Sequence, residues 1–533
     1  MFIIFSRGLM NKTYLNWLNL KDENIVKKLK KMNEKGIERN FSSSLSFGTG
    51  GIRGKMELGT NTLNEVLVAK FAFAFLKFLG GKKAKIVIAY DTRNNSKKFA
   101  EIMAKILSEK EVYLFNNFVP TPICVFATTF FKADFGIMIT ASHNHREYNG
   151  IKVFGQYGIQ IDTHDQEALS KGYNTTDEVK AYNEYLKLSG KDVHKIGHEI
   201  EDKFIENKCD KTKKNLKIVY TPLNGTGYYA VSRILKQNGF DFKTPKSQKN
   251  GNGEFKTCPY PNPEFVEAFS ESLKIANDAD IIIATDPDAD RLGVMARKNG
   301  EFVKLSGNEV GYILAENILS GTKNKTVVTS VVTSPLIEDI CKNNEAKLCK
   351  TLTGFKNLGR VTKELQDKNE DVVLVYEESC GYSVEKNFYD KDGIKSALKI
   401  CEIAEALKKQ NKTLFDYLDE IYAKYGRLYD LSDSIIFENS NDMQKVMEKL
   451  RKTKIEVVKI EKIIDYLNDN TGLEKQNFLE YKFKTGSFII RPSGTEPKLK
   501  IYVFVKKDDS LARILVRYCK YIIDSLLKTE NKD

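Results

Sequence analysis

The chain has 533 residues, of which 41% are hydrophobic and 29% are charged, a composition typical of a soluble globular protein with several domains. It carries 84 basic and 71 acidic residues, but the lysines are spread along the chain and form no basic aromatic cluster of the kind that stacks nucleic-acid bases. We therefore expect no nucleic-acid partner. The positive charge also fits a small anionic substrate.

No segment has the pattern of a membrane span or a secretion signal. The longest apolar stretch starts at Val66, is interrupted by Lys70 and Lys77, and predicts a core helix that ends at Gly80. The apolar part of MFIIFSRGL is too short for a secretory signal, and Met10 is an alternative start of the chain. The eight cysteines are scattered without a CxxC pair, which indicates reduced thiols and predicts a cytoplasmic protein.

A continuous apolar run followed by a polar loop occurs three times along the chain. The three segments are ADFGIMITASHN from Ala133, DADIIIATDPDADR from Asp278 and EDVVLVYEESCGY from Glu370. Such runs are typical of strands that are buried on both faces of a parallel sheet covered by helices. Ligands bind beyond the carboxyl ends of such strands, so we expect the three loops to line one cleft.

The predicted fold class is α/β. Three consecutive α/β units with mixed, largely parallel sheets surround a central cleft, and a smaller α+β C-terminal domain follows them. Polar breaks place the units at residues 1–200, 201–320 and 321–440, and the last domain at residues 441–533. The last domain is predicted to end in an amphipathic helix over residues 510–527.

The loop DPDADR has the pattern of a metal site. Asp286, Asp288 and Asp290 alternate, so an extended loop can turn their three carboxylates towards one hard cation. An EF-hand would need Gly and Glu where Arg291 and Arg297 stand, and zinc is disfavoured because no His or Cys is nearby. Mg²⁺ is the cation that fits, with a phosphate oxygen as a further ligand. The alternative is a solvated acidic turn without a metal.

Three other loops suggest the chemistry that this cation would serve. RPSGTEPKLK, from Arg491 to Lys500, gathers a guanidinium, hydroxyls and glycine-freed backbone N–H groups, which suits a phosphate dianion. EESCGY, from Glu377 to Tyr382, offers carboxylates and a hydroxyl to a sugar. TASHN presents Ser142 directly after a predicted strand. Together with the cation site, these loops specify phosphoryl transfer through a serine.

In this order, the motifs resemble those of the α-D-phosphohexomutase family, which includes phosphoglucomutases and phosphomannomutases. The resemblance runs from FGTGGIRG at Phe47 through TASHN, DPDADR, TGFKNLG at Thr353, EESCGY and DKDG at Asp390 to RPSGTEP at Arg491. It therefore spans nearly the whole chain. The FGTGGIRG and DKDG forms are most similar to the phosphoglucomutase-2-like and bacterial phosphoglucomutase/phosphomannomutase subgroup.

The resemblance implies a role for each matching residue. Ser142 would be the phosphoserine and would complete the coordination of Mg²⁺ by the three aspartates, while His143 or Lys152 would serve in proton transfer. Arg53, Lys152 and Arg291 would neutralise charge around the transferring phosphoryl group. The residues implied to bind the sugar are Thr353, Gly354, Lys356, Glu377, Ser379 and Lys391, and those implied to hold the second phosphate are Arg491, Ser493, Gly494 and Thr495.

The implied reaction interconverts hexose 1-phosphate and hexose 6-phosphate, of glucose, mannose or both. Phosphoserine gives its phosphoryl group to the sugar, and the resulting hexose 1,6-bisphosphate, also the activator, turns end for end before returning the other phosphate. Closure by the last domain would exclude water. The implied partners are sugar phosphates and no membrane, and the chain would be a monomer or a homodimer. Pentose phosphates share the same groups, so a phosphopentomutase stays an alternative.

One departure and three rival functions stay open. The family loop usually has the sequence TASHNP, but here His145 replaces the proline, so the turn loses a fixed φ. The alternative hypothesis is that His145 adds a phosphate contact. Gly225, Gly227 and Ala230 have dinucleotide-binding spacing, although no acidic residue is clearly placed about 20 residues further on. An aspartyl-phosphate phosphatase would leave Ser142 idle, and a non-enzymatic sugar-phosphate binding protein would not need it.

Overall fold

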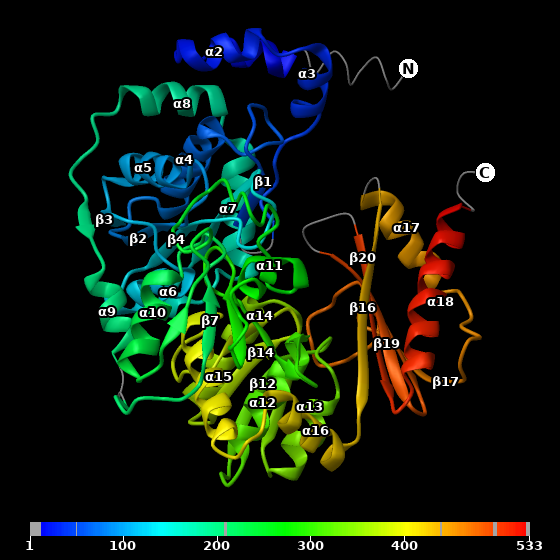
Figure 1. Ribbon diagram of the computed structural model, residues 1–533. Helices are drawn as coiled ribbons and strands as arrows, with labels where there is room; N and C mark the ends of the chain where they lie inside the picture. The colour runs from blue at the N-terminus through cyan, green and yellow to red at the C-terminus, as the bar shows by residue number, and fades with distance from the viewer. Residues whose placement is uncertain (1–11, 49–50, 207–209, 438–439, 494–497, 529–533) are drawn as a thin grey trace.

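The chain forms four units, each built on one sheet (Figure 1). The computed structural model describes residues 12–48, 51–206, 210–437, 440–493 and 498–528. The alternative start Met10 lies outside these residues. Among the described helices, none combines the length and the apolar surface that crossing a bilayer requires.

The first sheet is mixed and has six strands. They are β1 (Gly51–Lys55), β2 (Lys85–Tyr90), β3 (Glu111–Phe115), β4 (Phe135–Ile139), β5 (Tyr148–Phe154) and β6 (His194–Ile196). Their order is β1-β5-β4-β2-β3-β6. The strands β4, β2, β3 and β6 run parallel, whereas β5 pairs antiparallel with both β4 and β1. The run FGIMI, predicted as a buried strand, is β4.

Helices cover both faces of the first sheet because its strands are apolar on both sides. Ile86 and Ile88 pack in one cluster with the core helix α4, while Val87 and Ala89 pack in another with α6. As predicted, α4 ends at Gly80, where φ is 58°. The helices are α2 (Glu23–Lys30), α3 (Glu34–Asn40), α4 (Glu65–Leu79), α5 (Ser96–Leu107), α6 (Thr121–Phe130), η1 (Gln156–Gly158), α7 (Thr163–Thr175), α8 (Glu178–Lys187) and α9 (Glu199–Ile205).

The second unit has five strands, of which the central β9 is the predicted run IIIAT. The strands are β7 (Ile218–Thr221), β8 (Phe242–Lys243), β9 (Ile281–Thr285), β10 (Leu292–Lys298) and β11 (Glu301–Leu305). The order is β11-β10-β9-β7-β8, with β8, β7 and β9 parallel and β10 and β11 antiparallel. Its helices are α10 (Tyr228–Gln237), η2 (Val266–Phe269) and α11 (Ser270–Leu273).

The third unit has a four-stranded sheet, and its β14 contains the third predicted run. The strands are β12 (Lys325–Ser330), β13 (Lys347–Thr351), β14 (Asp371–Glu377) and β15 (Gly381–Ser383). The order is β13-β12-β14-β15, and only β15 is antiparallel. The helices are α12 (Gly307–Leu319), α13 (Leu336–Asn343), α14 (Phe355–Asp367), α15 (Gly393–Lys408) and α16 (Leu414–Tyr425).

The fourth unit differs from the others because its sheet is entirely antiparallel, in the order β16-β20-β19-β18-β17. Its elements are β16 (Leu428–Ile436), α17 (Ser440–Leu450), β17 (Ile460–Asp465), β18 (Leu479–Phe483), β19 (Gly486–Pro492), β20 (Lys498–Lys506) and α18 (Asp509–Lys528). Ile501 and Val503 pack with α18, whereas Tyr502 and Phe504 join the core of the other units. The predicted α+β character of the last domain and its final amphipathic helix are therefore confirmed, whereas its sheet begins with β16 at Leu428, before the predicted boundary at residue 441.

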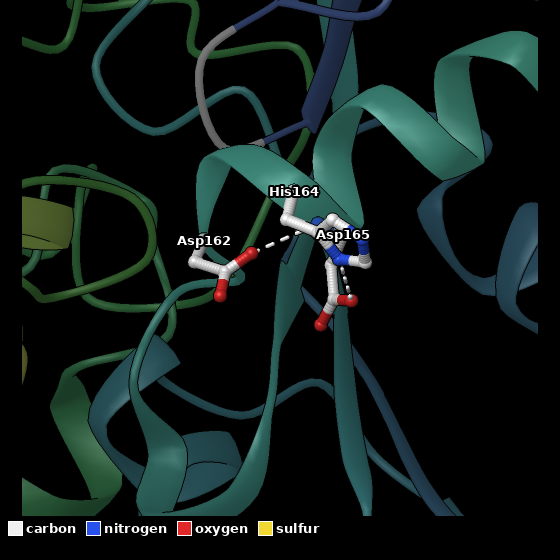
Figure 2. A group of neighbouring side chains, drawn as sticks. All are labelled: Asp162, His164 and Asp165. Atoms are coloured by element: carbon white, nitrogen blue, oxygen red, sulfur yellow. Dashed lines mark hydrogen bonds and ion pairs between the residues drawn. The ribbon is translucent and has the colours of Figure 1, made fainter.

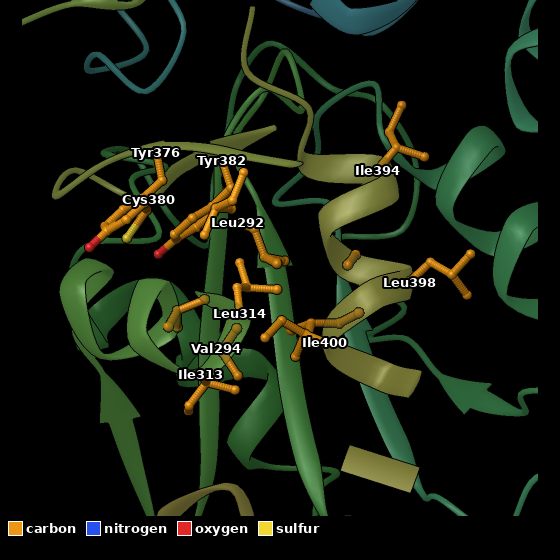
Figure 3. Close-up of a cluster of buried hydrophobic side chains, with 14 of the residues drawn as sticks. Leu292, Val294, Ile313, Leu314, Tyr376, Cys380, Tyr382, Ile394, Leu398 and Ile400 are labelled. Atoms are coloured by element: carbon orange, nitrogen blue, oxygen red, sulfur yellow. The ribbon is translucent and has the colours of Figure 1, made fainter. Parts of the chain in front are cut away.

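One buried apolar cluster continues through all four units. Figure 3 shows the part of it in which Leu292 and Val294 of β10 pack near Leu314 of α12 and Tyr382 of β15. Interiors of this kind are close-packed and hold their elements in fixed relative positions. The loops at the strand ends are consequently fixed relative to one another, which positions the site described next.

Candidate active site

The loop after β4 buries Ser142 between the first two units. Its side-chain Oγ donates a hydrogen bond of 2.7 Å to Oδ2 of Asp286 and lies 3.2 Å from Nδ1 of His143. Ser142 has a φ of 51°, a left-handed conformation that residues other than glycine rarely adopt and that is common at functional sites. The predicted nucleophile thus meets the predicted metal loop.

The predicted metal ligands lie together after β9. Asp286, Asp288 and Asp290 are buried, and one carboxylate oxygen from each lies within 4.8 Å of the other two. Burial and the two neighbouring carboxylates raise the pKa of Asp286 well above its usual value. Lys152 Nζ donates to Asp288 at 2.6 Å and to Asp290 at 2.8 Å, so the pKa of Asp288 is lowered although burial opposes this.

Two atoms of this group fit a divalent cation. Oδ1 of Asp288 and Oδ1 of Asp290 are buried, and neither has a hydrogen-bond partner. A buried carboxylate oxygen without a partner is costly, and its lone pairs suit a hard cation such as Mg²⁺. The orphaned oxygens therefore favour a metal site over the solvated acidic turn.

A second group of potential ligands, Asp162, His164 and Asp165, lies at the start of α7 (Figure 2). Asp162 accepts a hydrogen bond of 2.8 Å from the backbone N–H of Asp165, which makes it the cap of this helix. His164 Nδ1 lies 3.6 Å from Asp165 Oδ1, and the His164 side chain is 91% exposed. This group is explained by helix capping, so we assign it no metal.

Besides Lys152, two basic residues lie beside the acidic loop: Lys391, predicted to bind the sugar, and Arg291, predicted to neutralise charge. Lys391 Nζ lies 3.5 Å from Oδ2 of Asp290. Arg291 forms an ion pair with Glu264, and its backbone N–H donates to Asp286 at 3.0 Å. Since like charges repel in a buried site, these cations offset the acidic groups.

The predicted cation Arg53 approaches from β1, and its guanidinium donates to Oδ1 of Asn144 at 2.6 Å in the serine loop. His143 faces the same cations. Its loss of solvation and the nearby Arg291 and Arg53 guanidiniums lower the pKa of His143 well below its usual value. The imidazole is therefore neutral at pH 7. His145 instead points at Glu147, with Nδ1 3.4 Å from Oε2.

The predicted sugar-binding loop is attached to the second unit. Ser379 Oγ donates to Glu377 at 3.2 Å, and the carbonyl of Cys380 accepts a 3.0 Å hydrogen bond from the Leu292 backbone. Lys356, also predicted to bind sugar, is elsewhere engaged: its Nζ donates to Thr163 and Gln166 of α7, both at 2.9 Å. Gly354 begins α14 with a φ of 97°.

The predicted phosphate loop of the fourth unit meets the third unit. Arg491 of β19 donates a hydrogen bond from Nη1 to Oγ1 of Thr353. The backbone N–H of Ser493 donates to the carbonyl of Lys498 at 2.8 Å. Gly494 and Thr495 lie outside the described residues. The two predicted ligands Arg491 and Thr353 are thus brought together across the boundary between these units.

Sequence reasoning missed Arg93, the residue that organises the serine loop. Its buried guanidinium donates to the backbone carbonyls of Ser142 (2.6 Å), Asn144 (2.5 Å), His145 (3.1 Å) and Tyr148 (2.9 Å). Its Nε lies 3.3 Å from Oδ2 of the buried Asp91, which follows β2. The sequence feature that could have indicated Arg93 is the charged triplet DTR, which directly follows an apolar strand.

Two further residues beside the acidic loop were also missed. Thr121 donates from Oγ1 to Asp288 at 2.6 Å, and Glu264 forms an ion pair with the Arg291 guanidinium.

Gly225, one of the glycines with dinucleotide-binding spacing, packs against the acidic loop. A Cβ at Gly225 would lie 2.4 Å from Cα of Pro287, so this glycine permits close packing under the acidic loop. That packing explains the glycine without a dinucleotide.

Comparison with known proteins covers most of the chain. Four consecutive families match it: the phosphoglucomutase/phosphomannomutase alpha/beta/alpha domains I (residues 44–180), II (201–300) and III (306–425) and the C-terminal domain (440–520). A phosphoglucomutase from Staphylococcus haemolyticus is 34% identical over 529 residues, covering 93% of this chain and 96% of that protein.

Solved structures share the fold at lower identity. A putative phosphomannomutase from Thermus thermophilus superimposes with a TM-score of 0.71 at 20% identity, covering 90% of this chain and 99% of that one. An N-acetylphosphoglucosamine mutase from Aspergillus fumigatus, solved in complex with GlcNAc-6P and magnesium, gives a TM-score of 0.53 at 14% identity, covering 91% of this chain and 96% of that one.

We expect the Arg93→Met substitution to lower the free energy of unfolding by about 3–5 kcal/mol, because it leaves the buried Asp91 without its charged partner. Amide exchange over residues 141–148 should accelerate, since four carbonyls lose their common donor. Urea denaturation and hydrogen exchange measure the two effects.

The matched control is Arg39→Met, which breaks an ion pair with Glu57 in which the Arg39 side chain is 69% exposed. Exposed pairs contribute about 0–1 kcal/mol, so this variant should unfold almost like the wild type. Unchanged exchange of the serine loop in Arg93→Met would show that Arg93 does not organise it.

Proposed function

Because the chain belongs to the phosphoglucomutase/phosphomannomutase family and is therefore a phosphotransferase mutase, we propose that it interconverts hexose 1-phosphate and hexose 6-phosphate through Ser142. The observation that carries this proposal is the contact between Ser142 Oγ and Asp286. It places a hydroxyl that can carry a phosphoryl group against the acidic loop. The cationic side chains of Arg53, Lys152 and Arg291 lie near this hydroxyl.

The transfer step follows from that placement. The Oγ–P bond of phosphoserine breaks while a P–O bond forms to the free sugar hydroxyl. The hydroxyl proton leaves to a base, and the freed Ser142 Oγ takes up a proton, which restores the serine hydroxyl. Such transfer depends mostly on positioning and on stabilising charge over the phosphoryl oxygens. Arg53, Lys152 and Arg291 would provide that charge, and Lys391 lies close enough to contribute.

We assign Mg²⁺ to Asp286, Asp288 and Asp290, with an oxygen on Ser142 as a further ligand. The orphaned oxygens of Asp288 and Asp290 support this assignment, as does the magnesium in the Aspergillus mutase structure. When bound, the cation would neutralise charge next to Ser142.

His143 is the better of the two candidates for proton transfer. Lys152 is held by two carboxylates that raise its pKa above the usual value, although burial opposes them, so it keeps its proton. His143 is neutral and next to Ser142 Oγ, so it can accept the proton of the sugar hydroxyl at neutral pH.

The phosphoryl donor Ser142 and the proposed phosphate-binding loop both stay in place. The substrate must therefore be able to exchange the positions of its two ends. We propose that Arg491, Ser493, Gly494 and Thr495 hold the phosphate that is not reacting. The sugar would lie against the residues Thr353, Gly354, Lys356, Glu377, Ser379 and Lys391. A hexose 1,6-bisphosphate can reverse between the two sites, and so each phosphate reaches Ser142 in turn. A second Aspergillus mutase structure contains glucose 1,6-bisphosphate.

Glucose phosphate is the proposed preferred substrate because the similar Staphylococcus proteins carry the name phosphoglucomutase. Mannose and pentose phosphates offer the same phosphate and hydroxyl groups, and one methylene-sized difference changes transition-state binding by only about 1–3 kcal/mol. Comparison of kcat/KM for glucose, mannose and ribose 1-phosphates ranks them. A higher value for ribose 1-phosphate would replace the proposal by a phosphopentomutase.

We expect Ser142 to carry one phosphoryl group after incubation with glucose 1,6-bisphosphate and Mg²⁺, and to lose or exchange it on addition of glucose 1-phosphate. Intact mass and peptide mapping of residues 133–152 measure this. The Ser142→Ala variant should stay unmodified and should lose at least about 10³-fold in kcat, because the covalent carrier is gone. Phosphate on another residue, or full activity of the variant, would exclude the mechanism.

Asp288→Asn should weaken Mn²⁺ binding by at least about tenfold, measured by electron paramagnetic resonance with Mn²⁺ as the probe. The reason is the loss of one anionic ligand in a site with three. Asp165→Asn, which changes the exposed group in Figure 2, is the control and should bind Mn²⁺ as the wild type does. Equal effects of the two variants would argue against the assignment.

The pH dependence of kcat/KM distinguishes the two bases. The pKa of His143 is lowered, so its imidazole stays neutral even at the pH values at which a histidine ordinarily gains a proton. We therefore expect kcat/KM to stay constant from about pH 7 to 9. The pKa of Lys152 is raised, so a lysine base would make the rate climb steadily through that window. A tenfold rise per pH unit would transfer the role to Lys152.

A further inference from the structure

A loop of the second unit, residues 250–260, lies against the serine loop of the first. We call it the 250–260 strap. Its Pro259 carbonyl accepts a 2.9 Å hydrogen bond from the backbone N–H of Arg146, and its Glu254 carbonyl accepts one of 3.2 Å from the Arg146 side chain. Asn94 of the first unit donates to Glu254 Oε1 at 2.8 Å. The strap therefore contacts both the serine loop and the turn after β2.

Phe255 is the part of the strap that reaches Arg93. Its side chain is fully buried, and the centre of the Arg93 guanidinium lies 5.3 Å from the centre of its ring. The edge of the same guanidinium donates to carbonyls of the serine loop, so the ring supports the group that holds Ser142. Phe255 has a φ of 41°, a costly conformation for a bulky residue that the surrounding contacts must impose.

The two backbones approach too closely for side chains. A Cβ on Gly253 would lie 2.4 Å from the backbone nitrogen of Asn94, and one on Gly251 would lie 2.6 Å from Cγ2 of Thr92. Asn224 in turn anchors the strap to its own unit, because its side chain donates to the Asn250 carbonyl at 2.9 Å. Little relative movement is possible at such a contact.

The strap supplies a constraint that the serine loop does not contain. His145 stands where the resembling loops have proline, and its imidazole turns outward to Glu147 rather than restricting the backbone. The loop has internal hydrogen bonds, such as that from the Ser142 backbone N–H to Thr140, but four of its carbonyls are held from outside by Arg93, on which the Phe255 ring stacks.

We propose that the 250–260 strap is a positioning element for phosphoryl transfer, in which Phe255 acts through Arg93 to fix Ser142 against the acidic loop. This inference rests on the proposed function, because the step that it controls is the transfer to Ser142. It assigns to the second unit a role beyond carrying the three aspartates.

The test is Phe255→Leu in the full-length chain, which removes the flat ring but keeps an apolar side chain. Phosphoryl transfer from glucose 1,6-bisphosphate to Ser142, followed by rapid quench and peptide mass, should slow by about 10- to 100-fold because small misplacements of reacting groups have effects of that order. Binding of the bisphosphate should change by less than about threefold, and amide exchange over residues 140–148 should accelerate.

The matched control is Phe302→Leu. Phe302 also stacks on an arginine of the second unit, with the Arg297 guanidinium 4.4 Å from its ring centre, but on the β10–β11 hairpin. Phe302 is partly buried, so this variant should lose the contact between ring and guanidinium, with less packing than Phe255→Leu loses, and should not slow the transfer. Equal slowing of phosphoryl transfer in both variants would show general destabilisation and would overturn the proposal. An unchanged transfer rate in Phe255→Leu would also overturn it.

A rescue separates loop order from other effects. His145→Pro, placed in the Phe255→Leu background, should recover most of the lost rate because it fixes φ within the loop itself. Failure to recover would show that Phe255 does not supply loop order. If the wild type takes no phosphate on Ser142, the proposed function fails, and the exchange of residues 140–148 in the two phenylalanine variants still decides whether the strap orders the loop.

Discussion

Three buried carboxylates, with one oxygen of each within 4.8 Å of the others, are the constraint on which this structure depends. Like charges at such a distance, away from water, are stable only with nearby cations and hydrogen-bond donors. The compensation comes from different units: Lys152 and Thr121 from the first, and Lys391 from the third. The site therefore requires the assembled units, and the continuous apolar core keeps them assembled.

The second constraint on the proposed reaction is the separation of its two proposed phosphate sites. Ser142 and the acidic loop lie between the first two units, whereas Arg491 meets Thr353 where the fourth unit contacts the third. A ligand that serves both places needs an anionic group at each end. Burial and the neighbouring Glu377 raise the pKa of Glu378 in the third unit.

Local sequence was sufficient for the elements that bury apolar runs and for the motifs at their ends. FGIMI, IIIAT and VVLVYE predicted three strands because continuous β-branched or aliphatic residues fit a sheet covered on both faces. Arg93 and Glu264 escaped prediction because an arginine or a glutamate in a polar turn is usually solvated. Only the fold shows that Arg93 is buried under Phe255 and donates to a loop about fifty residues further along the chain.

The sequence by itself determined the strand–loop pattern, the three alternating aspartates, the serine and the order of the motifs, because each depends on neighbours along the chain. The tertiary structure alone decided that Ser142 meets Asp286, that Lys152 pairs with Asp288 and Asp290, and that the 250–260 strap contacts the serine loop. The physical reason is that burial, charge compensation and van der Waals contact between distant segments depend on distances in space, which local patterns do not specify.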